Sequence, residues 1–424
     1  MPSHRHRFSF PIASVVCLAA LLTGCGQKHG KYTSEHISQA QEKMAILKSG
    51  TEWQMAQQQF LAGDLDKSLK TVNRSLAINP NVPKSHVLKG RILIEKGRLE
   101  EARECFLTAE KLDENNIDAQ YYLGIVHEQF NQPEEALTRY NRAAELDGAN
   151  PQYPVAAAEM LVQLGRLDEA EQLLNAKKSV FQYNAAVRQS LGHIAQLRNN
   201  PAAAVVCFNE AMLLAPDDAA ILEDLAQAQF AAGQFGEAEY SFNRLLALPE
   251  NANRRDLKSM RAKCLVKVNR HVEARSILLE LTSTTDQESV RDVTAWIDLG
   301  NVCAVLKDRP NLRNASARLV AIAPERHEGY TLRAMWLRLD GKTEDALTST
   351  DQAITRCGSD PAPFIFRALL QQELGRPFDA RQSLQEALTR NPNATAARNM
   401  LARVDAQING QQPTAVTSGE NTNQ

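Results

Sequence analysis

The stretch YYLGIVHEQFNQPEEALTRYNRAAELD, residues 121–147, contains two runs of apolar residues at helical spacing, separated by a short polar turn. A Leu-Gly pair precedes a small residue, an aromatic residue and a second small residue: Leu123, Gly124, Ala136, Tyr140 and Ala143. The same order returns 68 residues later, at Leu191, Gly192, Ala204, Phe208 and Ala211. A pattern that returns at a fixed spacing indicates a chain built from copies of one supersecondary unit.

Ten such repeats follow one another along the 424-residue chain. They begin at residues 49, 83, 117, 151, 185, 219, 255, 293, 327 and 361. The first six starts are 34 residues apart, and extra residues are inserted before repeats 7 and 8. All ten repeats hold Gly or Ala at the eighth position, and eight of the ten hold Ala at the twentieth. Because such small side chains let two helices approach closely, each repeat is predicted to be a pair of packed helices that stacks on its neighbours.

The fifteenth position of each repeat lies between its two predicted helices. Nine of the ten repeats have Gly or Asn there, and Lys307 is the exception. Gly and Asn adopt the left-handed backbone conformation that ends a helix, so a tight turn is predicted at this position.

This pattern resembles the tetratricopeptide repeat (TPR) family over residues 49–394. The resemblance implies an all-α fold, a right-handed α-solenoid of about ten TPR helix-turn-helix repeats. The inserted residues suggest two sub-arrays, with repeats 1–6 at 49–254 and repeats 7–10 at 255–394. Residues 395–408 are predicted to be a capping helix, because the last pair would otherwise expose its apolar face.

The two ends of the chain differ in composition from the repeats. Residues 409–424 are polar and lack large apolar groups, so we expect a disordered tail. Residues 1–24 begin with basic residues and continue with a short apolar run from Ile12 to Leu22, the pattern of a secretory signal peptide. A membrane-spanning helix needs about 20 apolar residues, so this run is too short to be one.

The end of the apolar run resembles the signal of bacterial lipoproteins at Leu22, Thr23, Gly24 and Cys25. The resemblance implies cleavage between Gly24 and Cys25, followed by lipidation of Cys25 with acyl chains such as palmitate. Residues 25–48 would then comprise the lipidated cysteine, a polar tether and a leading helix that packs on repeat 1. The expected location is the bacterial cell envelope, lipid-anchored, and the outer membrane facing the periplasm if the bacterium is didermal, because Gly26 rather than Asp follows the cysteine.

Residues with the spacing of a catalytic or metal site are missing from the sequence. The cysteines and histidines are scattered, and Gly341-Lys342-Thr343 lacks the earlier glycine of a phosphate-binding loop, since Trp336 stands in its place. The 48 basic residues balance the 50 acidic ones, which argues against a nucleic-acid partner. We therefore predict a protein that is not an enzyme and has no cofactor, no metal and no small-molecule substrate, with a hydrolase site assembled across repeats as a remaining alternative.

The resemblance also implies a concave groove lined by the first helix of each repeat. The groove candidates carried onto this chain are Trp53, Phe60, Val87, Arg91, Ile94, Tyr121, Ile125, Glu128, His193, Phe230, Lys263, Lys267, Asn301, Met335 and Arg338. Lys263, Lys267, Asn301 and Arg338 come from three successive repeats, and as one cluster they would hold an acidic or C-terminal peptide segment. The alternative interpretation is a solvated face with an ordinary scatter of charge.

These features together predict a membrane-anchored bacterial TPR lipoprotein. It would be a protein–protein interaction scaffold in envelope assembly or secretion, with unknown protein partners in the groove and a membrane attachment through its lipid. The alternative is a regulatory or adaptor subunit of an enzyme complex for envelope glycan synthesis or polysaccharide export.

Overall fold

The computed structural model describes residues 31–283 and 287–410, and the side chains of residues 31–35, 287 and 288 are not described. The predicted signal peptide, the Gly24–Cys25 cleavage and lipidation site, and residues 411–424 of the predicted tail lie outside these ranges. The described chain divides into two compact bodies, here called the N-terminal body (up to Gln182) and the C-terminal body (from Tyr183).

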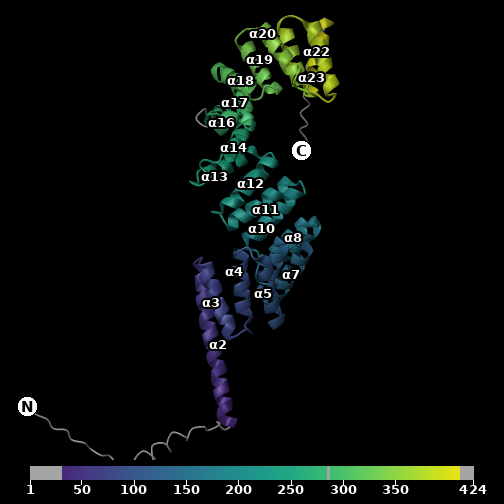
Figure 1. Ribbon diagram of the computed structural model, residues 1–424. Coiled ribbons are helices and arrows are strands. Elements are labelled where there is room, and N and C mark those ends of the chain that lie inside the picture. Colours follow the sequence, from purple (N-terminus) through teal and green to yellow (C-terminus); the bar gives the residue numbers. More distant parts are fainter. Residues whose placement is uncertain (1–30, 284–286, 411–424) are drawn as a thin grey trace, which may run out of the picture. The chain divides into compact units, whose positions relative to one another are not determined.

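Both bodies consist of helices that follow one another in pairs (Figure 1). The N-terminal body contains α2 (Lys31–Leu61), α3 (Leu65–Ile78), α4 (Pro83–Glu95), α5 (Leu99–Leu112), α6 (Ile117–Gln129), α7 (Pro133–Leu146), α8 (Gln152–Gln163) and α9 (Leu167–Lys177). The C-terminal body begins with α10 (Ala185–Leu197), α11 (Pro201–Leu214), α12 (Ala219–Ala231), α13 (Phe235–Leu246), α14 (Arg255–Lys267), α15 (His271–Leu281) and α16 (Gln287–Arg291). It continues with α17 (Val293–Leu306), α18 (Arg309–Ile322), α19 (His327–Leu339), α20 (Thr343–Ile354), α21 (Ala362–Glu373), α22 (Pro377–Arg390) and α23 (Thr395–Ile408).

The predicted fold class is confirmed within the described residues, which contain helices and no strands. Helix pairs of the TPR type stack on one another, and helices two steps apart, such as α4 and α6 or α17 and α19, also contact each other. At the end of the stack, Ala397 and Val404 of α23 are buried in a cluster with Phe364 and Leu384. The last helix thus covers apolar surface that α21 and α22 would otherwise expose.

Three of the four glycines at the eighth position, Gly90, Gly124 and Gly192, lie against aromatic side chains of the second helix of their own repeat. A Cβ atom at Gly124 would lie 2.4 Å from the Tyr140 ring, and one at Gly192 would lie 2.5 Å from the Phe208 ring. Both rings are fully buried, so they have little room to move. The close approach of two helices therefore explains why this position excludes larger residues.

The turn between the helices has a positive φ at the fifteenth position in all ten repeats: Gly63, Gly97, Asn131, Gly165, Asn199, Gly233, Asn269, Lys307, Gly341 and Gly375. Lys307, the residue that departs from the sequence pattern, has a φ of 55° and adopts the same conformation. The shape of the turn is thus retained where the sequence does not favour it.

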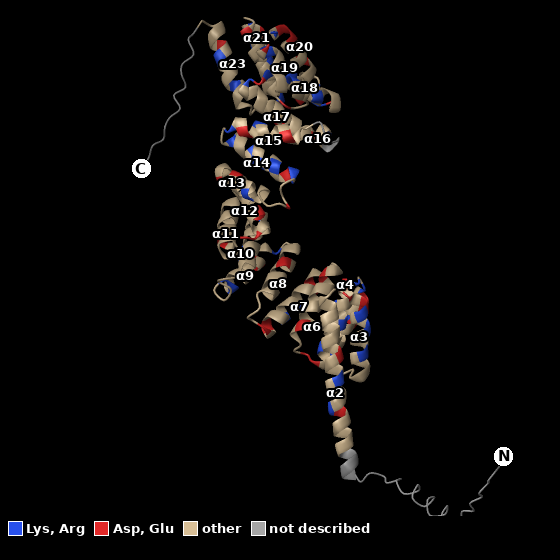
Figure 2. Ribbon diagram, turned by 90° about the vertical axis from the view of Figure 1, so that its left-hand side faces the viewer, with Lys and Arg blue, Asp and Glu red and all other residues tan. Residues whose placement is uncertain are grey.

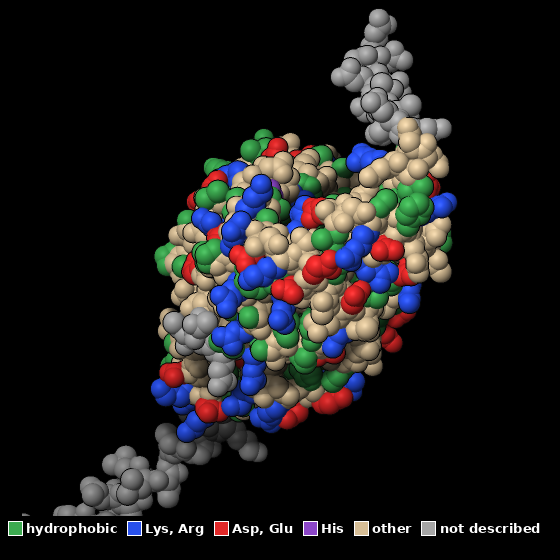
Figure 3. Space-filling model, turned by 90° about the horizontal axis from the view of Figure 1, so that it is seen from above, with side chains coloured by type: hydrophobic (Ala, Val, Ile, Leu, Met, Phe, Trp, Pro, Cys, Tyr) green, Lys and Arg blue, Asp and Glu red, His purple; other side chains and the backbone are tan. Residues whose placement is uncertain are grey.

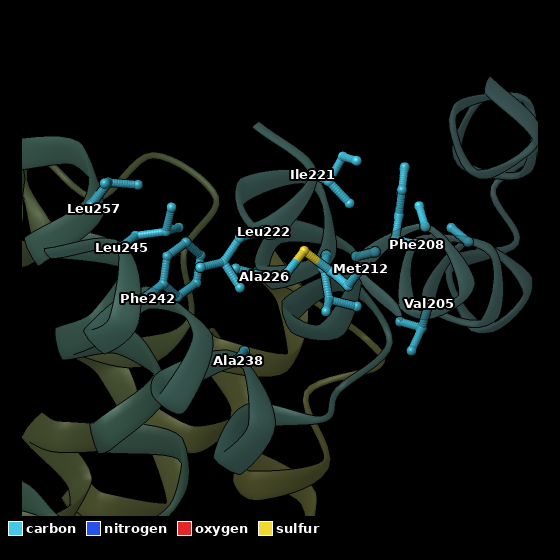
Figure 4. Packing of buried hydrophobic residues seen from close by; sticks show 14 of the residues in the cluster. Val205, Phe208, Met212, Ile221, Leu222, Ala226, Ala238, Phe242, Leu245 and Leu257 are labelled. Carbon is cyan, nitrogen blue, oxygen red and sulfur yellow. The ribbon is translucent and has the colours of Figure 1, made fainter. Parts of the chain in front are cut away.

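The boundary between the two bodies differs from the predicted boundary at residues 254/255. Phe242 and Leu245 of α13 share one buried cluster with Leu257 of α14, so the insertion before repeat 7 does not interrupt the core (Figure 4). Ser289, a residue of the later insertion, is also held, because Arg255 donates hydrogen bonds to Ser289 Oγ (2.8 Å) and to the Leu281 carbonyl oxygen (2.9 Å).

The compact bodies instead divide at Gln182/Tyr183, after a shortened helix. Helix α9 has 11 residues, whereas α7 has 14. Lys177 occupies the repeat position that Ala143 fills in α7, where the alanine is completely buried. A lysine is costly to bury at such a place. The helix ends at this residue.

The leading helix also differs from the prediction, since it does not pack on repeat 1. It continues without a break into the first helix of that repeat, forming the 31-residue α2. Figure 1 shows α2 extending well past the end of α3. The side chains of Met44, Ile46 and Leu47 are more than half exposed there. The cause is length, because α3 has only 14 residues and can cover only the second half of α2.

Candidate functional site

Several groove candidates of the N-terminal body form a row across successive first helices. The Arg91 guanidinium lies over the Phe60 ring, with its carbon 4.9 Å from the ring centroid, and 5.2 Å from the centroid of Tyr122. Tyr121 contacts the rings of Tyr122 and Tyr153 at centroid distances of 5.4 and 5.3 Å. These contacts hold the row together by cation–π and aromatic interactions, and its members are partly buried.

Other candidates in this body are committed to internal contacts. Trp53 donates a hydrogen bond from Nε1 to the Lys84 carbonyl oxygen (3.1 Å), and the Lys84 ammonium lies 4.2 Å from its ring centroid. Glu128 accepts a 2.7 Å hydrogen bond from the Tyr140 hydroxyl, and burial raises the pKa of that tyrosine. Val87 was predicted to face the groove, and this prediction is wrong, because its side chain is 5% exposed within a core cluster.

The C-terminal body contains a cavity of about 310 Å³ formed by repeats 6 to 8. Its lining comes from α12, α14, α15 and α17: Phe230, Ala262, Lys263, Val266, Lys267, His271, Leu278, Asp298, Asn301, Val302 and Val305. Ligand-binding pockets begin at about 300 Å³, so this cavity has room for a small group or a few side chains of a partner. It brings together Phe230, Lys263, Lys267 and Asn301, which are four of the predicted groove residues.

Two buried polar atoms of this lining have no hydrogen-bond partner among the described residues: Asp298 Oδ2 and His271 Nδ1. Burial raises the pKa of Asp298 above its ordinary value of 3.8, because desolvation disfavours the carboxylate, and the Lys263 ammonium opposes this only in part. Leaving a buried polar atom unpaired costs about 1–3 kcal/mol. The cavity therefore carries hydrogen-bonding capacity that the protein itself does not use.

The two lysines of the lining, Lys263 and Lys267, also form no ion pair among the described residues. The Lys267 ammonium lies 5.9 Å from the Phe235 ring centroid. Nearby arginines behave differently: Arg261 and Arg270 both pair with Glu239, at 2.8 and 2.9 Å. The two lysines thus lack the short ion pairs that these arginines form, although the Lys263 ammonium lies close enough to Asp298 to lower its pKa in part.

Arg338 does not belong to this group, contrary to the predicted cluster of four residues. Its Nε lies 2.8 Å from Glu373 Oε1 on α21, and the contact is bidentate. Met335 packs at the edge of the core cluster around Trp296. His193 is likewise engaged, with its Nε2 2.8 Å from Asp224 Oδ2.

Asp298 and His271 are lining residues that were not among the predicted candidates. Asp298 is at the sixth position of repeat 8, where most other repeats have an uncharged residue. His271 is at the seventeenth position of repeat 7, where six other repeats have Leu or Pro. A polar residue at a usually apolar repeat position was the signal in the sequence that marked both.

The described cysteines, histidines and carboxylates outside the cavity show no arrangement typical of a reactive thiol or a metal site. Four of the five cysteines in the described part are buried as free thiols, and burial raises the pKa of Cys264 and Cys303 to about 12. Within residues 31–283 and 287–410, no group of three or more His, Cys, Asp or Glu residues could hold a metal ion. No described helix combines the length and apolar character needed to cross a membrane.

Charge is mixed over both bodies. Figure 2 shows basic and acidic positions interspersed along the helices, and Figure 3 shows both kinds of side chain intermingled with apolar ones on the face it displays. The faces shown therefore carry mixed charge rather than one broad field of a single sign.

Comparison with known families agrees with the repeat pattern. Residues 90–130 match a family described as TPR repeat, and residues 121–179 and 190–253 match a family described as tetratricopeptide repeat. These segments are tetratricopeptide repeats. They extend from the first helix of repeat 2 into the loop after repeat 6, and they include Phe230 in the cavity wall.

Curated relatives match parts of the chain. Protein O-mannosyl-transferase TMTC3 from Homo sapiens is 28% identical over 120 residues, which are 28% of this chain and 13% of that protein. DnaJ homolog subfamily C member 3 from Rattus norvegicus is 24% identical over 180 residues, or 39% of this chain and 36% of that protein. The chain thus spans less than half the length of both relatives.

A solved structure of a tetratricopeptide repeat protein from Parabacteroides merdae ATCC 43184 is 18% identical, with a TM-score of 0.43. The match covers 60% of this chain and 99% of that one.

Proposed function

We propose that this protein is a scaffold of the bacterial cell envelope, anchored by a lipid on Cys25, that holds protein partners on its first helices. TPR arrays suit protein–protein interaction, and the helices here present side chains from many repeats to a partner. The process served is envelope assembly or secretion, and the anchor fixes the array at a membrane surface, at the outer membrane in a didermal bacterium.

The cavity between α12, α14 and α17 is the observation that carries the proposal. It combines apolar walls with two unpaired lysines and two buried polar atoms that lack partners in the described ranges. A folded protein normally pairs such groups, so their presence in one cavity favours an external partner.

The anchor rests on the sequence Leu22-Thr23-Gly24-Cys25. Two or three acyl chains hold a protein at a membrane stably, whereas a single chain binds only marginally. Replacing Cys25 by Ser is expected to abolish labelling by a fatty-acid analogue and to move the protein from the membrane fraction to the soluble fraction. Labelling that survives the substitution would refute the anchor.

Site-specific photocrosslinking in intact cells tests the scaffold itself. A photoreactive amino acid at Val305, which lines the cavity and is 62% exposed, is expected to capture a discrete protein partner. The matched control is Val206 on α11, which is 58% exposed and lies away from the first helices. Equal capture at both positions, or none at Val305, would contradict the proposal.

The identity of the captured protein separates the two functions considered. A structural component of an envelope or secretion assembly supports the scaffold. An enzyme of glycan synthesis or polysaccharide export would instead favour the role of regulatory or adaptor subunit.

A further inference from the structure

The chemistry of the cavity restricts what can occupy it. Its walls include the side chains of Phe230, Val266, Leu278 and Val302, and such a surface favours an apolar group of moderate size. Val305 adds an exposed apolar side chain at the border of the cavity. One part of the occupant is therefore aliphatic.

The two lysines of the cavity favour an occupant that carries an anionic group beside the aliphatic one. Basic residues around the cavity have carboxylate partners, for example Arg254 with Glu223 (2.6 Å) and Arg275 with Asp308 (2.9 Å). Lys263 and Lys267 have none within the described ranges, although Lys263 lies close enough to Asp298 to influence its pKa. A carboxylate on the occupant would give both lysines the partner that their neighbours already have.

Asp298 adds a third requirement, because its carboxylate needs a hydrogen-bond donor. Oδ2 is shielded from solvent, and rotation about the soft χ2 torsion of the carboxyl group exchanges the two oxygens. A free inorganic anion has no apolar part and no N–H donor for this carboxylate, and a purely apolar ligand would leave the carboxylate without a hydrogen-bond donor. A peptide supplies all three features, since its backbone N–H groups donate, one side chain is aliphatic and a second is acidic.

We propose that this cavity binds an extended internal segment of a protein partner in which an aliphatic residue and an Asp or Glu stand two positions apart, so that both side chains lie on the same face of the segment. The inference deepens the proposed scaffold function and rests on it. An internal segment is favoured over a chain end because the first helices of further repeats precede α12 and follow α17, so the bound chain can continue in both directions within the C-terminal body.

A selection experiment tests the composition of the segment. Phage displaying short random peptides are panned on the immobilised full-length protein, and the enriched sequences are compared with those retained by the K263Q/K267Q variant. Enriched peptides are expected to place Leu, Ile or Val two positions from Asp or Glu. Selection of peptides without an acidic residue, or no enrichment at all, would overturn the inference.

Quantitative binding of one enriched peptide, synthesised with both ends blocked, then tests the residues. K263Q/K267Q is expected to weaken binding roughly tenfold or more, because charge-assisted contacts are lost. The matched control K67Q/K70Q removes the same charge from two exposed lysines of α3 and is expected to leave binding unchanged. Equal binding by both double variants, or binding only when the peptide has a free C-terminal carboxylate, would also overturn the inference.

Asp298→Ala separates a binding role from a structural one. Peptide affinity is expected to fall roughly tenfold, while the thermal unfolding temperature does not fall, because burial disfavours the removed carboxylate and its Oδ2 has no hydrogen-bond partner among the described residues. A lower unfolding temperature with unchanged affinity would assign Asp298 to the fold instead. In each of these failures, partner capture from Val305 in cells would still report on the scaffold function separately.

Discussion

The C-terminal body contains two neighbouring pairs of repeats that can be compared, repeats 5 and 6 and repeats 7 and 8. They differ in the hydrogen bonding of the aspartate at the sixth position. Asp224, at the sixth position of repeat 6, accepts hydrogen bonds from Gln189 Nε2 (2.7 Å) and has His193 Nε2 at 2.8 Å. Asp298, at the sixth position of repeat 8, has Lys263 at the place of His193, and its Oδ2 has no partner in the described ranges. In repeats 5 and 6 the aspartate at this position is hydrogen-bonded within the protein. In repeats 7 and 8 one oxygen of the aspartate has no such bond among the described residues.

The small residue at the eighth position shows the same contrast. In repeat 5, Gly192 faces the buried ring of Phe208 within its own repeat. In repeat 8, Ser316 replaces the aromatic residue, and Gly300 faces Leu332 of the next repeat instead. The departure of repeat 8 therefore changes the packing of α17 against α19, and α17 also contributes residues to the candidate cavity.

The largest expected effect comes from adding a methyl group at the two glycines. Gly192→Ala forces its Cβ to within 2.5 Å of a fully buried ring and is expected to destabilise the protein by about 2–3 kcal/mol. Gly300→Ala meets the end of the flexible Leu332 side chain, so about 1 kcal/mol is expected. Hydrogen exchange of peptides from α10–α11 and α17–α19 measures the two losses locally. Equal losses would mean that the two packing arrangements are equally rigid.

The two aspartates are expected to respond in opposite directions. Asp224→Asn weakens the hydrogen bonds at Gln189 and His193 and is expected to lower stability by about 1 kcal/mol. Asp298→Asn removes a partly buried charge whose Oδ2 has no hydrogen-bond partner among the described residues, and it is expected to raise stability by up to about 1 kcal/mol at neutral pH.

The gain from Asp298→Asn is also expected to depend on pH. The pKa of Asp298 is raised in the folded protein, so the unfolded chain loses this proton first as the pH rises. The penalty on the native protein is therefore absent below the ordinary pKa of 3.8 and complete above the raised folded value. Urea unfolding at about pH 7 and about pH 4 measures it. A gain that does not shrink at the lower pH would show that the carboxylate is not penalised by burial.

The smallest expected effect is at the turn. Lys307 adopts the left-handed conformation that Asn199 adopts in repeat 5, with φ values of 55° and 54°. Lys307→Gly is expected to stabilise repeat 8 by about 0.5–1 kcal/mol, because glycine has no Cβ to strain there. Asn199→Gly is expected to change stability by only a few tenths of a kcal/mol, since Asn tolerates this conformation. Thermal unfolding of both variants gives the comparison, and a loss at Lys307→Gly would contradict it.

The sequence predicted the repeats well because their constraints are local. Gly or Ala at the eighth position, and Gly or Asn at the fifteenth, mark helix contacts and turns that are complete within one repeat. Features that depend on neighbouring repeats were not predictable in this way. The division at Gln182/Tyr183 comes shortly after the shortened α9, which ends at Lys177, and the exposed half of α2 follows from the shorter length of α3.

The candidate site was predictable only in part for a related reason. Family positions named Phe230, Lys263, Lys267 and Asn301 as groove candidates, and all four line one cavity. They also named Arg338, which Glu373 engages from the next repeat. Whether a charged side chain is free depends on its neighbours across repeats, and one repeat's pattern does not contain that information. The sequence does not distinguish Asp298 from Asp224. Only the structure shows that Asp224 has hydrogen-bond partners, whereas Asp298 Oδ2 has none among the described residues.

The most direct test of the account is the affinity of one selected peptide for two matched variants, Asp298→Ala and Asp224→Ala. The account predicts that Asp298→Ala loses peptide affinity without losing thermal stability, and that Asp224→Ala loses stability while it retains most of the affinity. Peptide binding that is unaffected by Asp298→Ala, or reduced equally in both variants, would contradict the claim that the unpaired groups of repeats 7 and 8 form the binding site.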